Sequence, residues 1–391
     1  MRILITDGNE RAALAAARSL IRAGHDVHVA SSRRDAIAAV SRKVRAHRLA
    51  SDPFADPGAH AAALCALAHA EGIDVLLPMT DQTVEAVLEH RASFPATTVI
   101  PFPDLAIYRA ASDKQQLEEL AAACGFSVPE THVLPAWRGR DVALPEADFF
   151  PAVVKPHRSV VSDGTTRRKL TVTPVADAAA CRAALDRLPP SAYPVLLQRH
   201  IPGVGEGFFA LRWEGRIVAM FAHRRLREKP LTGGVSVYRE SIALDERLAL
   251  PGRRLLDALD WTGVAMIECK RDPATGRQYV MEMNGRFWGS LQLAVDAGVD
   301  FPALLVRCIA GDVPAECPPY RVGVRSRWFW GDVDHLYLRL RRGGPRLAPF
   351  LDLMRMRPGR DHGEIWRWRD PMPFLSESVQ WAGGALARKM R

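Results

Sequence analysis

The residues most suited to chemistry in this sequence are two glutamates and an asparagine near residue 275. The segments WTGVAMIECK and RQYVMEMN read as strands, and RDPATGR between and overlapping them supplies the turn formers Asp-Pro and Thr-Gly. An antiparallel hairpin centred near Thr275 pairs Glu268 with Glu282 and points Asn284 to the same face as Glu282. Two carboxylates whose Cβ atoms lie ~5 Å apart destabilise a hairpin unless a cation separates them. Carboxylate and amide oxygens suit Mg²⁺, so the hairpin predicts a magnesium site, with a solvated polar face as the alternative.

Three basic residues are placed where they can meet phosphate groups. Arg286 lies two positions beyond Asn284 and can bind a phosphoryl oxygen through two N–H groups. Lys155 ends the apolar strand AVVKP, where an inward-facing ammonium needs an anionic partner. Lys114 begins a helix, where its charge opposes the helix dipole, so a bound phosphate explains it better than helix stability. Either lysine alone also fits a surface residue that extends to water.

The elements that position these residues follow an α/β pattern at the start of the chain. RILIT, HDVHVA, IDVLLPM and TTVIPFP read as strands, separated by helices near residues 10–23, 60–70 and 82–90. This order predicts a doubly wound domain with a parallel sheet over about the first 105 residues. The first turn, TDGNERA, lacks the G-x-G-x-x-G fingerprint, which argues against nicotinamide binding.

A second set of elements follows. Ser112 is expected to cap a helix ending at Gly125. The strands FPAVVKP and LTVTPV enclose residues 157–169, a loop rich in hydroxyl groups and arginines that is typical of a lid over phosphates and is predicted to become ordered when nucleotide binds. After a helix near 177–188, VLLQRHIPG, GFFALRW and IVAMFAHRR read as successive strands.

The order of these motifs resembles the ATP-grasp superfamily, specifically its carboxylate–amine ligases. The resemblance covers about residues 1–312 and is carried by SDK (112–114), FPAVVKP (150–156), VLLQRHIPGVGEG (195–207), MIECK (266–270) and EMNGRFWGS (282–290). It implies an α/β fold with an N-terminal parallel-sheet domain (1–108), a linker helix and small lid subdomain (109–197), and a catalytic subdomain (198–320). A basic extension (321–391) follows.

The resemblance also implies roles for individual residues. Lys114 and Lys155 are expected to contact the ATP phosphates, Glu206 the ribose, and the hinge Gln198, Arg199, His200 and Ile201 the adenine. Glu268, Glu282 and Asn284 are expected to bind Mg²⁺, for which Mn²⁺ can substitute, and Arg286 to steady the transferring phosphoryl group; Arg286 and Lys155 are thus the expected catalytic residues.

Two features depart from the family pattern. The hinge begins with Gln198, where relatives often carry an acidic residue, and Gly164 is the lid's only glycine. Arg167, Arg168 and Lys169 are the predicted substitutes for glycine backbone amides.

The segment AHRRLREKPLTGGVS (222–236) is the candidate pocket for the acyl substrate. Gly233 and Gly234 allow a ligand to approach the backbone closely, and Arg224 and Arg225 can neutralise a carboxylate. Similarity to carboxylate-binding relatives favours this assignment over a solvent-facing basic hairpin.

The implied reaction joins a small carboxylic acid to an amine through an acyl phosphate, releasing ADP and phosphate. Rival readings are another acceptor, such as a thiol or bicarbonate, and an ATP-binding module without turnover. The sequence leaves the identities of the acid and the amine and the oligomeric state open.

Charge and cysteine content bound the remaining possibilities. Of the net charge of +9, residues 321–391 contribute +8, from fifteen Lys and Arg against seven Asp and Glu, and they hold five of the nine tryptophans. Two alternatives fit this extension. Its tryptophans pack on the body of the protein or on a second subunit, or the extension makes peripheral contact with an anionic membrane. A basic charge confined to the tail, without a recognised motif, argues against nucleic-acid binding. Six cysteines without C-x-x-C indicate a reduced, cytoplasmic setting, at the inner membrane face if the tail attaches there.

Overall fold

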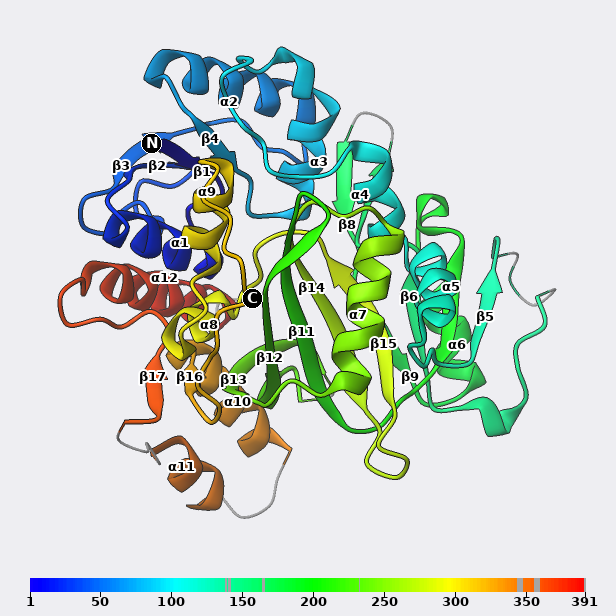
Figure 1. The fold of residues 1–391 in the computed structure, drawn as a ribbon. Helices are drawn as coiled ribbons and strands as arrows, with labels where there is room; N and C mark the ends of the chain where they lie inside the picture. Colours follow the sequence, from blue (N-terminus) through cyan, green and yellow to red (C-terminus); the bar gives the residue numbers. More distant parts are fainter. Residues whose placement is uncertain are drawn as a thin grey trace.

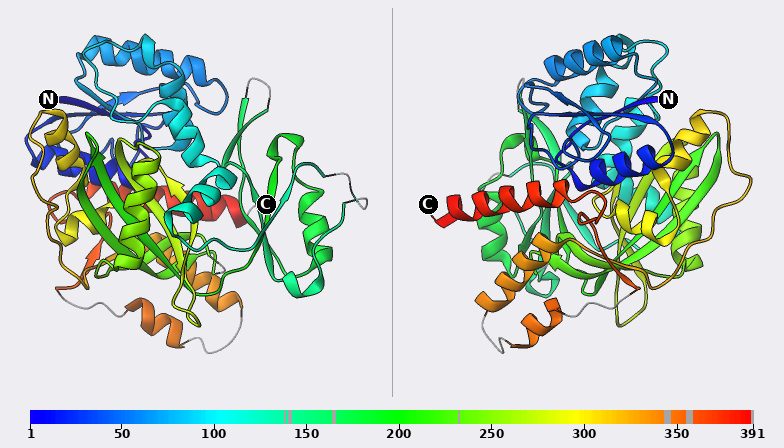
Figure 2. Two further views of the ribbon diagram at one scale, coloured as in Figure 1. Left: turned by 45° about the vertical axis from the view of Figure 1, so that its right-hand side comes forward. Right: turned by 90° about the vertical axis from the view of Figure 1, so that its left-hand side faces the viewer.

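The strands of this computed structural model form four sheets, which are arranged as three lobes (Figures 1 and 2). The structure describes residues 1–389 except 138, 140–141, 164–165, 232, 343–346 and 355–358. A parallel sheet forms the first lobe, a seven-stranded sheet the centre, and a small antiparallel sheet the third. The predicted fold class is confirmed.

The N-terminal lobe is a doubly wound α/β unit. Its strands are β1 (Arg2–Ile5), β2 (Asp26–Ser31), β3 (Arg45–Arg48) and β4 (Val75–Leu77), all parallel, in the order β3-β2-β1-β4. Its helices are α1 (Arg11–Arg22), α2 (Pro57–Glu71) and α3 (Asp81–Glu89). The predicted strand TTVIPFP is wrong, because this segment contributes only an isolated bridge between Val99 and Val75. β3 was not expected, since RAHR has no apolar alternation.

Two helices connect this lobe to the rest of the chain. They are α4 (Leu105–Ser112) and α5 (Lys114–Cys124). Asp113, rather than the predicted Ser112, caps α5, and its carboxylate accepts from the backbone N–H groups of Gln115 and Gln116. The helix ends at Gly125 in a left-handed conformation, as predicted.

The small sheet has the order β5-β10-β6-β9 and is antiparallel. Its strands are β5 (Thr131–Leu134), β6 (Ala152–Pro156), β9 (Thr173–Val175) and β10 (Val195–Arg199), and it packs on α6 (Ala178–Leu185). A separate two-stranded ribbon, β7 (Val160–Asp163) and β8 (Thr166–Lys169), occupies the predicted lid.

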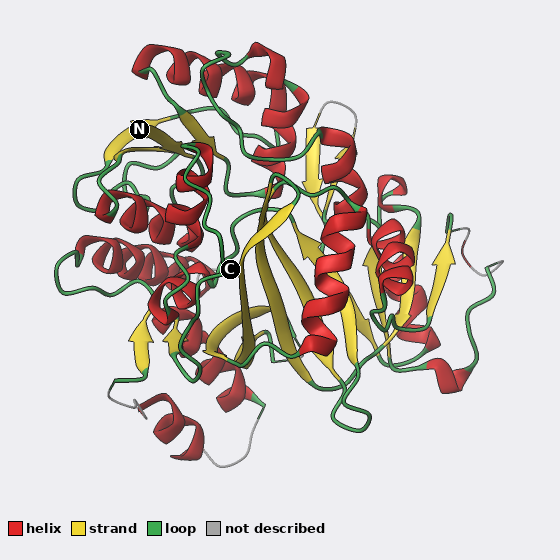
Figure 3. Ribbon diagram, in the orientation of Figure 1, coloured by secondary structure: helices red, strands yellow, loops and turns green. Residues whose placement is uncertain are grey.

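The central sheet has the order β15-β14-β11-β12-β13-β16-β17. Its main strands are β11 (Val204–Trp213), β12 (Arg216–Lys229), β13 (Val235–Ser241), β14 (Gly263–Arg271) and β15 (Gln278–Asn284). One face packs on α4, α5 and α7 (Glu246–Ala258) (Figure 3). The other packs on α8 (Leu291–Ala297) and α9 (Phe301–Ile309), which contact α1 in turn, so one core joins the central and N-terminal lobes.

The C-terminal extension packs on the body of the protein. Its strands β16 (Arg325–Arg327) and β17 (Asp361–Gly363) extend the central sheet, and its helices are α10 (Phe329–Arg341), α11 (Leu347–Met354) and α12 (Met372–Lys389). β16 pairs with β13 of the body, and Asp370 pairs with Arg18 of α1 at 2.8 Å. Within the extension, Trp330 stacks on Trp381 with ring centroids 4.2 Å apart. Trp368, in contrast, is 86% exposed.

Of the two alternatives for the tail, these contacts favour packing over membrane attachment. In the described part of the chain, no helix combines the length and the apolar character needed to cross a membrane.

Candidate active site

A cavity of about 440 Å³ opens between the small sheet and the central sheet. Most of the predicted site residues line it: Lys114, Lys155, Gln198, Arg199, His200, Ile201, Arg225, Gly233, Gly234, Glu268, Glu282, Asn284 and Arg286. They come from both sheets, from the start of α5 and from the loops after β10, β12 and β15. Residues far apart in the sequence therefore converge on one space.

The hairpin β14–β15 has the predicted register, with Glu268 opposite Glu282. The amide nitrogen of Asn284 donates to Glu282 Oε1 at 3.1 Å, so these two side chains share a face as expected. Glu268 accepts from Arg225. Burial raises the pKa of Glu268; Arg225 opposes this rise and the facing Glu282 adds to it. Two carboxylates and an amide oxygen on one face of a hairpin form a donor set that fits Mg²⁺.

Lys155 is buried at the end of β6, where it was predicted. Its ammonium donates to Gln198 Oε1, and the Gln198 amide nitrogen donates to Glu118 Oε1 at 2.5 Å. Burial lowers the pKa of Lys155 to about 8 despite the nearby carboxylates, of which Glu118 has the largest effect. The lysine is thus held by neutral Gln198 and is open to an anionic ligand.

Lys114 reaches the same cavity from the first turn of α5. Its Nζ donates to Ser159 Oγ at 3.2 Å, and the residue is only 4% exposed. Burial lowers the pKa of Lys114, although Glu282 and Asp81 favour its charged form. Two buried ammonium groups near one cavity favour an anion with several charges, as a polyphosphate has.

The segment from Gln198 to Ile201 connects the small sheet to the central one. The Gln198 side chain is buried, while the guanidinium of Arg199 turns outward to Glu130. The carbonyl of Ile201 accepts from Lys270 Nζ at 3.0 Å. Apolar side chains of Val153, Val172, Met266 and Met281 line the same cavity. The hinge therefore adjoins an apolar slot of the kind that a planar base occupies.

Arg286 is held by a carboxylate that the sequence did not reveal as part of the site. Its Nε and Nη2 donate to the two oxygens of Asp81 at 2.9 Å each, and Nη2 also donates to Asn284 Oδ1 at 3.2 Å. Tyr108 donates its hydroxyl to Asp81 at 3.0 Å. Burial would raise the pKa of Asp81, but Arg286 and Tyr108 outweigh burial and lower it. The N-terminal lobe thus orients a residue of the central cavity.

Two predicted site residues lie away from the cavity. Arg224 points to the opposite face of β12 and pairs with Glu240 at 2.7 Å, because neighbouring residues of a strand alternate between faces. Glu206 likewise lies on the far face of β11, where it accepts from Arg271 and Gln278 at 2.8 Å each. Their expected roles in binding the acyl substrate and the ribose are corrected by these positions.

The predicted lid contacts the N-terminal lobe of the same chain through Arg167. The guanidinium of Arg167 is 4% exposed and donates to Glu89 Oε2 at 2.7 Å and to the Gln82 carbonyl at 2.9 Å. Neither Arg167, Arg168 nor Lys169 lines the cavity, so their expected role as phosphate donors is not supported. Gly164 lies outside the described residues. Protein contacts, and not phosphates alone, are available to order this ribbon.

Two further residues of the cavity were missed from sequence. Gly205 of β11 lines it, and a Cβ at this position would lie 2.8 Å from Arg225 Cδ. Arg11 lines the cavity from the first turn of α1. Arg11 and Asp81 each begin a helix after a parallel strand, the position at which open α/β sheets bind ligands, and this signal was available in the sequence.

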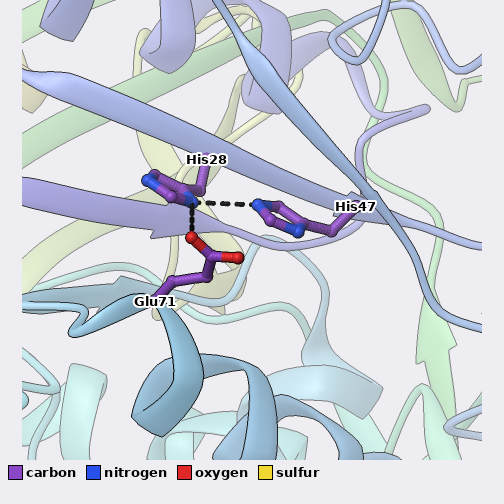
Figure 4. A group of neighbouring side chains, drawn as sticks. All are labelled: His28, His47 and Glu71. Atoms are coloured by element: carbon purple, nitrogen blue, oxygen red, sulfur yellow. Dashed lines mark hydrogen bonds and ion pairs between the residues drawn. The ribbon is translucent and has the colours of Figure 1, made fainter.

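A second group of potential metal ligands lies in the N-terminal lobe (Figure 4). His28 Nδ1 is 2.9 Å from His47 Nε2 and 3.9 Å from Glu71 Oε2, and the two rings are within 4° of parallel. Two nitrogens on one tetrahedral Zn²⁺, each ~2.0–2.1 Å from the ion, lie ~3.4 Å apart. The shorter separation is that of a hydrogen bond, so this group is a hydrogen-bonded histidine pair beside a carboxylate.

Comparison with known proteins was made by sequence and by structure. No protein-family model and no curated protein matches the sequence. An L-amino acid ligase from Bacillus licheniformis matches in structure with a TM-score of 0.62 and 15% identity, covering 83% of this chain and 78% of that one. N5-carboxyaminoimidazole ribonucleotide synthetase from Thermus thermophilus matches at 0.58 and 18%, covering 83% and 81%.

A third match extends the comparison to carboxylases. The biotin carboxylase domain of a Hydrogenobacter thermophilus 2-oxoglutarate carboxylase, solved with MgADP, ADP and bicarbonate, gives a TM-score of 0.62 and 12% identity, covering 83% of this chain and 73% of that one. The matched proteins are ATP-grasp enzymes. This chain has the ATP-grasp fold. At these identities the likeness concerns the fold, and the ATP-grasp resemblance expected from the sequence is confirmed at that level.

Proposed function

We propose that this protein is an ATP-dependent ligase that activates a carboxylate as an acyl phosphate and joins it to an amine, releasing ADP and phosphate. The observation that carries the proposal is the convergence of Glu268, Glu282, Asn284 and Arg286 with two buried lysines on one cavity. Acidic metal ligands next to phosphate-binding cations are what phosphoryl transfer requires. The ATP-grasp fold and its likeness to an L-amino acid ligase support this reading.

In this proposal the protein contributes position and charge rather than a covalent intermediate. Lys155 and Lys114 hold the phosphates, the 198–201 hinge and the apolar slot hold the adenine, and Arg286, oriented by Asp81, faces the transferring group. Glu268, Glu282 and Asn284 would hold a divalent ion, which would neutralise part of the phosphate charge. The donor set contains only oxygens, which suits Mg²⁺ and also Mn²⁺.

The residues also suggest where the acyl phosphate forms. The loop with Gly233 and Gly234 borders the cavity, and the two glycines have φ values of 115° and 154° that side chains rarely adopt. Arg225 lies under this loop, where it donates to the Gly234 carbonyl at 3.0 Å. We assign this end of the cavity to the acyl substrate; of the predicted pair of Arg224 and Arg225, only Arg225 borders it, and its charge is balanced by Glu228 and Glu268.

Carboxylation is the second candidate function. The matched biotin carboxylase domain was solved with bicarbonate and MgADP, and bicarbonate can be phosphorylated in the same way as a carboxylic acid. Both reactions need the phosphate and metal residues described above, and they differ only in which carboxylate and acceptor bind.

Product detection separates these functions. The protein is incubated with ATP, Mg²⁺, a pool of amino acids and small acids, and bicarbonate, and new masses are recorded together with ADP. We expect a product equal to the sum of an acid and an amine minus water. A product whose mass equals that of one substrate plus carbon dioxide favours carboxylation. ATP binding without ADP formation, whichever substrates are present, contradicts both enzymatic functions.

A further inference from the structure

Arg11 is a cavity residue that none of the roles above includes. It is the first residue of α1, in the N-terminal lobe, and its Nη2 lies 3.0 Å from the position that a Cβ would occupy at Gly289. The absence of a side chain at Gly289 therefore leaves room for the guanidinium. The Arg11 side chain is 13% exposed, and it lines the cavity together with Trp288 and Ser290.

Two residues of the C-terminal extension, Glu364 and Trp328, contact the Arg11 side chain. Arg11 Nη1 donates to Glu364 Oε2 at 2.6 Å, and the guanidinium carbon lies 4.1 Å from the centroid of the Trp328 ring. Glu364, whose side chain is 2% exposed, also pairs with the fully buried Arg239 of β13. Trp328 is fixed in turn, because its Nε1 donates to Glu377 at 2.7 Å. Two elements of residues 321–391 thus determine where the Arg11 side chain lies.

The charges of this group do not balance. Arg11 and Arg239 carry two positive charges, and Glu364 carries one negative charge. The nearby Glu377 compensates only in part, because burial raises its pKa to about 7. Arg225 and Arg286 already have carboxylate partners in Glu268 and Asp81. A buried group with an excess positive charge is costly unless an anion joins it, and Arg11 is the member that reaches the cavity.

Arg11 also has N–H groups that its hydrogen bond to Glu364 does not use. Its hydrogen bond to Glu364 uses Nη1, and among the described residues no hydrogen bond from its Nε or Nη2 is seen. A guanidinium carries five N–H donors in a planar fork that matches a carboxylate. In the proposed function the phosphate groups already have Lys114, Lys155 and Arg286 as partners, so a carboxylate is the anion left for Arg11.

We propose that Arg11 binds a carboxylate group of a substrate, and that Glu364 of the C-terminal extension positions Arg11 for this task. The proposal rests on the proposed function, since it assigns a substrate group to the same cavity. The carboxylate has two sources: the acid that is phosphorylated, or an amino acid that serves as the amine. On this account residues 321–391 complete the active site.

The first test measures binding without turnover. Thermal unfolding of the wild type and of Arg11→Gln is compared with a non-hydrolysable ATP analogue, Mg²⁺ and either a pool of the standard amino acids or a pool of small di- and tricarboxylic acids. We expect at least one pool to stabilise the wild type and to lose this effect in Arg11→Gln, with ATP-analogue binding unchanged. Arg11→Gln leaves Glu364 paired with Arg239, so the fold should persist.

The chain offers a matched control in Arg18. It lies on the same helix and pairs with Asp370 of the same extension at 2.8 Å, with both side chains 12% exposed, yet it does not line the cavity. Arg18→Gln should lower the unfolding temperature without changing the response to the pools. If Arg18→Gln abolishes the response as Arg11→Gln does, the effect is structural and the proposal is wrong.

Kinetics with the active pair of substrates identifies the source of the carboxylate. Arg11→Gln should raise one KM by about 10- to 100-fold, the loss expected for a charged hydrogen-bonded pair, and leave the KM of ATP unchanged. A raised KM for the acid in amine-independent ADP formation identifies the phosphorylated acid, and a raised KM for the amine alone identifies the acceptor. Glu364→Asp should raise the same KM to a smaller extent with kcat retained.

The outcomes separate this inference from the proposed function. A wild type that binds carboxylates through Arg11 but forms no ADP supports the binding site and contradicts the ligase. A wild type that forms ADP with a carboxylate while Arg11→Gln keeps both KM values supports the ligase and contradicts the role of Arg11. A wild type that neither pool stabilises contradicts the inference directly.

Discussion

The ammonium of Lys155 gives the affinity for ATP a predicted dependence on pH. Burial lowers its pKa to about 8; Glu118, Glu282 and Glu268 oppose this shift, and Lys114 adds to it. If the phosphates bind the protonated lysine, about nine-tenths of the protein is competent at pH 7 and about one-tenth at pH 9. The dissociation constant of MgATP should therefore rise about tenfold between these two pH values.

Calorimetric titration with a non-hydrolysable ATP analogue at pH 7, 8 and 9, at constant ionic strength, measures this change. The phosphate groups of the analogue titrate alike with the wild type and with Lys155→Arg, so this variant is the control for them. In Lys155→Arg the guanidinium stays charged, so the tenfold change should be lost, and any pH dependence that remains should come from these phosphate groups and from Lys114, whose pKa burial also lowers. A wild type without pH dependence, or a Lys155→Arg variant that retains the full dependence, would refute the reasoning.

The same pKa shift affects the free protein. The pKa of Lys155 is lower in the folded state, at about 8, than its ordinary value of 10.5. Between these pH values the unfolded chain binds more protons, so the free energy of unfolding should increase as the pH rises through this window. Lys155→Arg should lack this part of the increase.

Three other predictions follow from the site and the tail. Glu282→Gln should lower Mg²⁺-dependent ADP formation by about a hundredfold or more with an unchanged circular dichroism spectrum, because it removes a metal ligand; unchanged turnover would exclude the metal site. Asp81→Asn should lower kcat by about 10- to 100-fold by releasing Arg286, whereas Asp257→Asn, which removes one of the two carboxylates paired with Arg212 outside the cavity, should not; equal effects would mean lost stability rather than lost orientation. The full chain should not float with anionic liposomes at low salt, because its tail pairs with β13 and with two arginines of α1 and so packs on the body; salt-sensitive flotation would revive the membrane alternative.

Local sequence signals were sufficient for the hairpin and the cavity residues near it. The turn RDPATGR predicted the pairing of Glu268 with Glu282, and the structure has this pair. A register shift between Glu268 and Cys269, which the sequence did not reveal, moves the pairing by one residue between the turn and the two glutamates. The proline after AVVK correctly indicated that Lys155 lies near the end of a strand. Helix-capping rules correctly placed Lys114 in the first turn of a helix, although the predicted cap was one residue too early.

Contacts between segments far apart in the chain could not be predicted from local sequence patterns. Whether Arg224 or Arg225 faces the cavity depends on the phase of β12, and an arginine-rich strand has no apolar alternation to reveal that phase. Arg167 and Arg286 each meet carboxylates of α3, and Arg11 meets Glu364 from the other end of the chain. Such pairs follow from the packing of the lobes, which one sequence does not encode in any short pattern.

The most direct test of the acyl phosphate uses oxygen isotopes. In the proposed reaction a carboxylate oxygen becomes the bridge to the phosphoryl group, and the attack of the amine breaks the bond between this oxygen and the acyl carbon. With an acid labelled with ¹⁸O in its carboxylate, the released phosphate should carry one ¹⁸O atom for each amide formed, as measured by mass spectrometry. Phosphate free of the label, formed together with the amide, would contradict activation through an acyl phosphate.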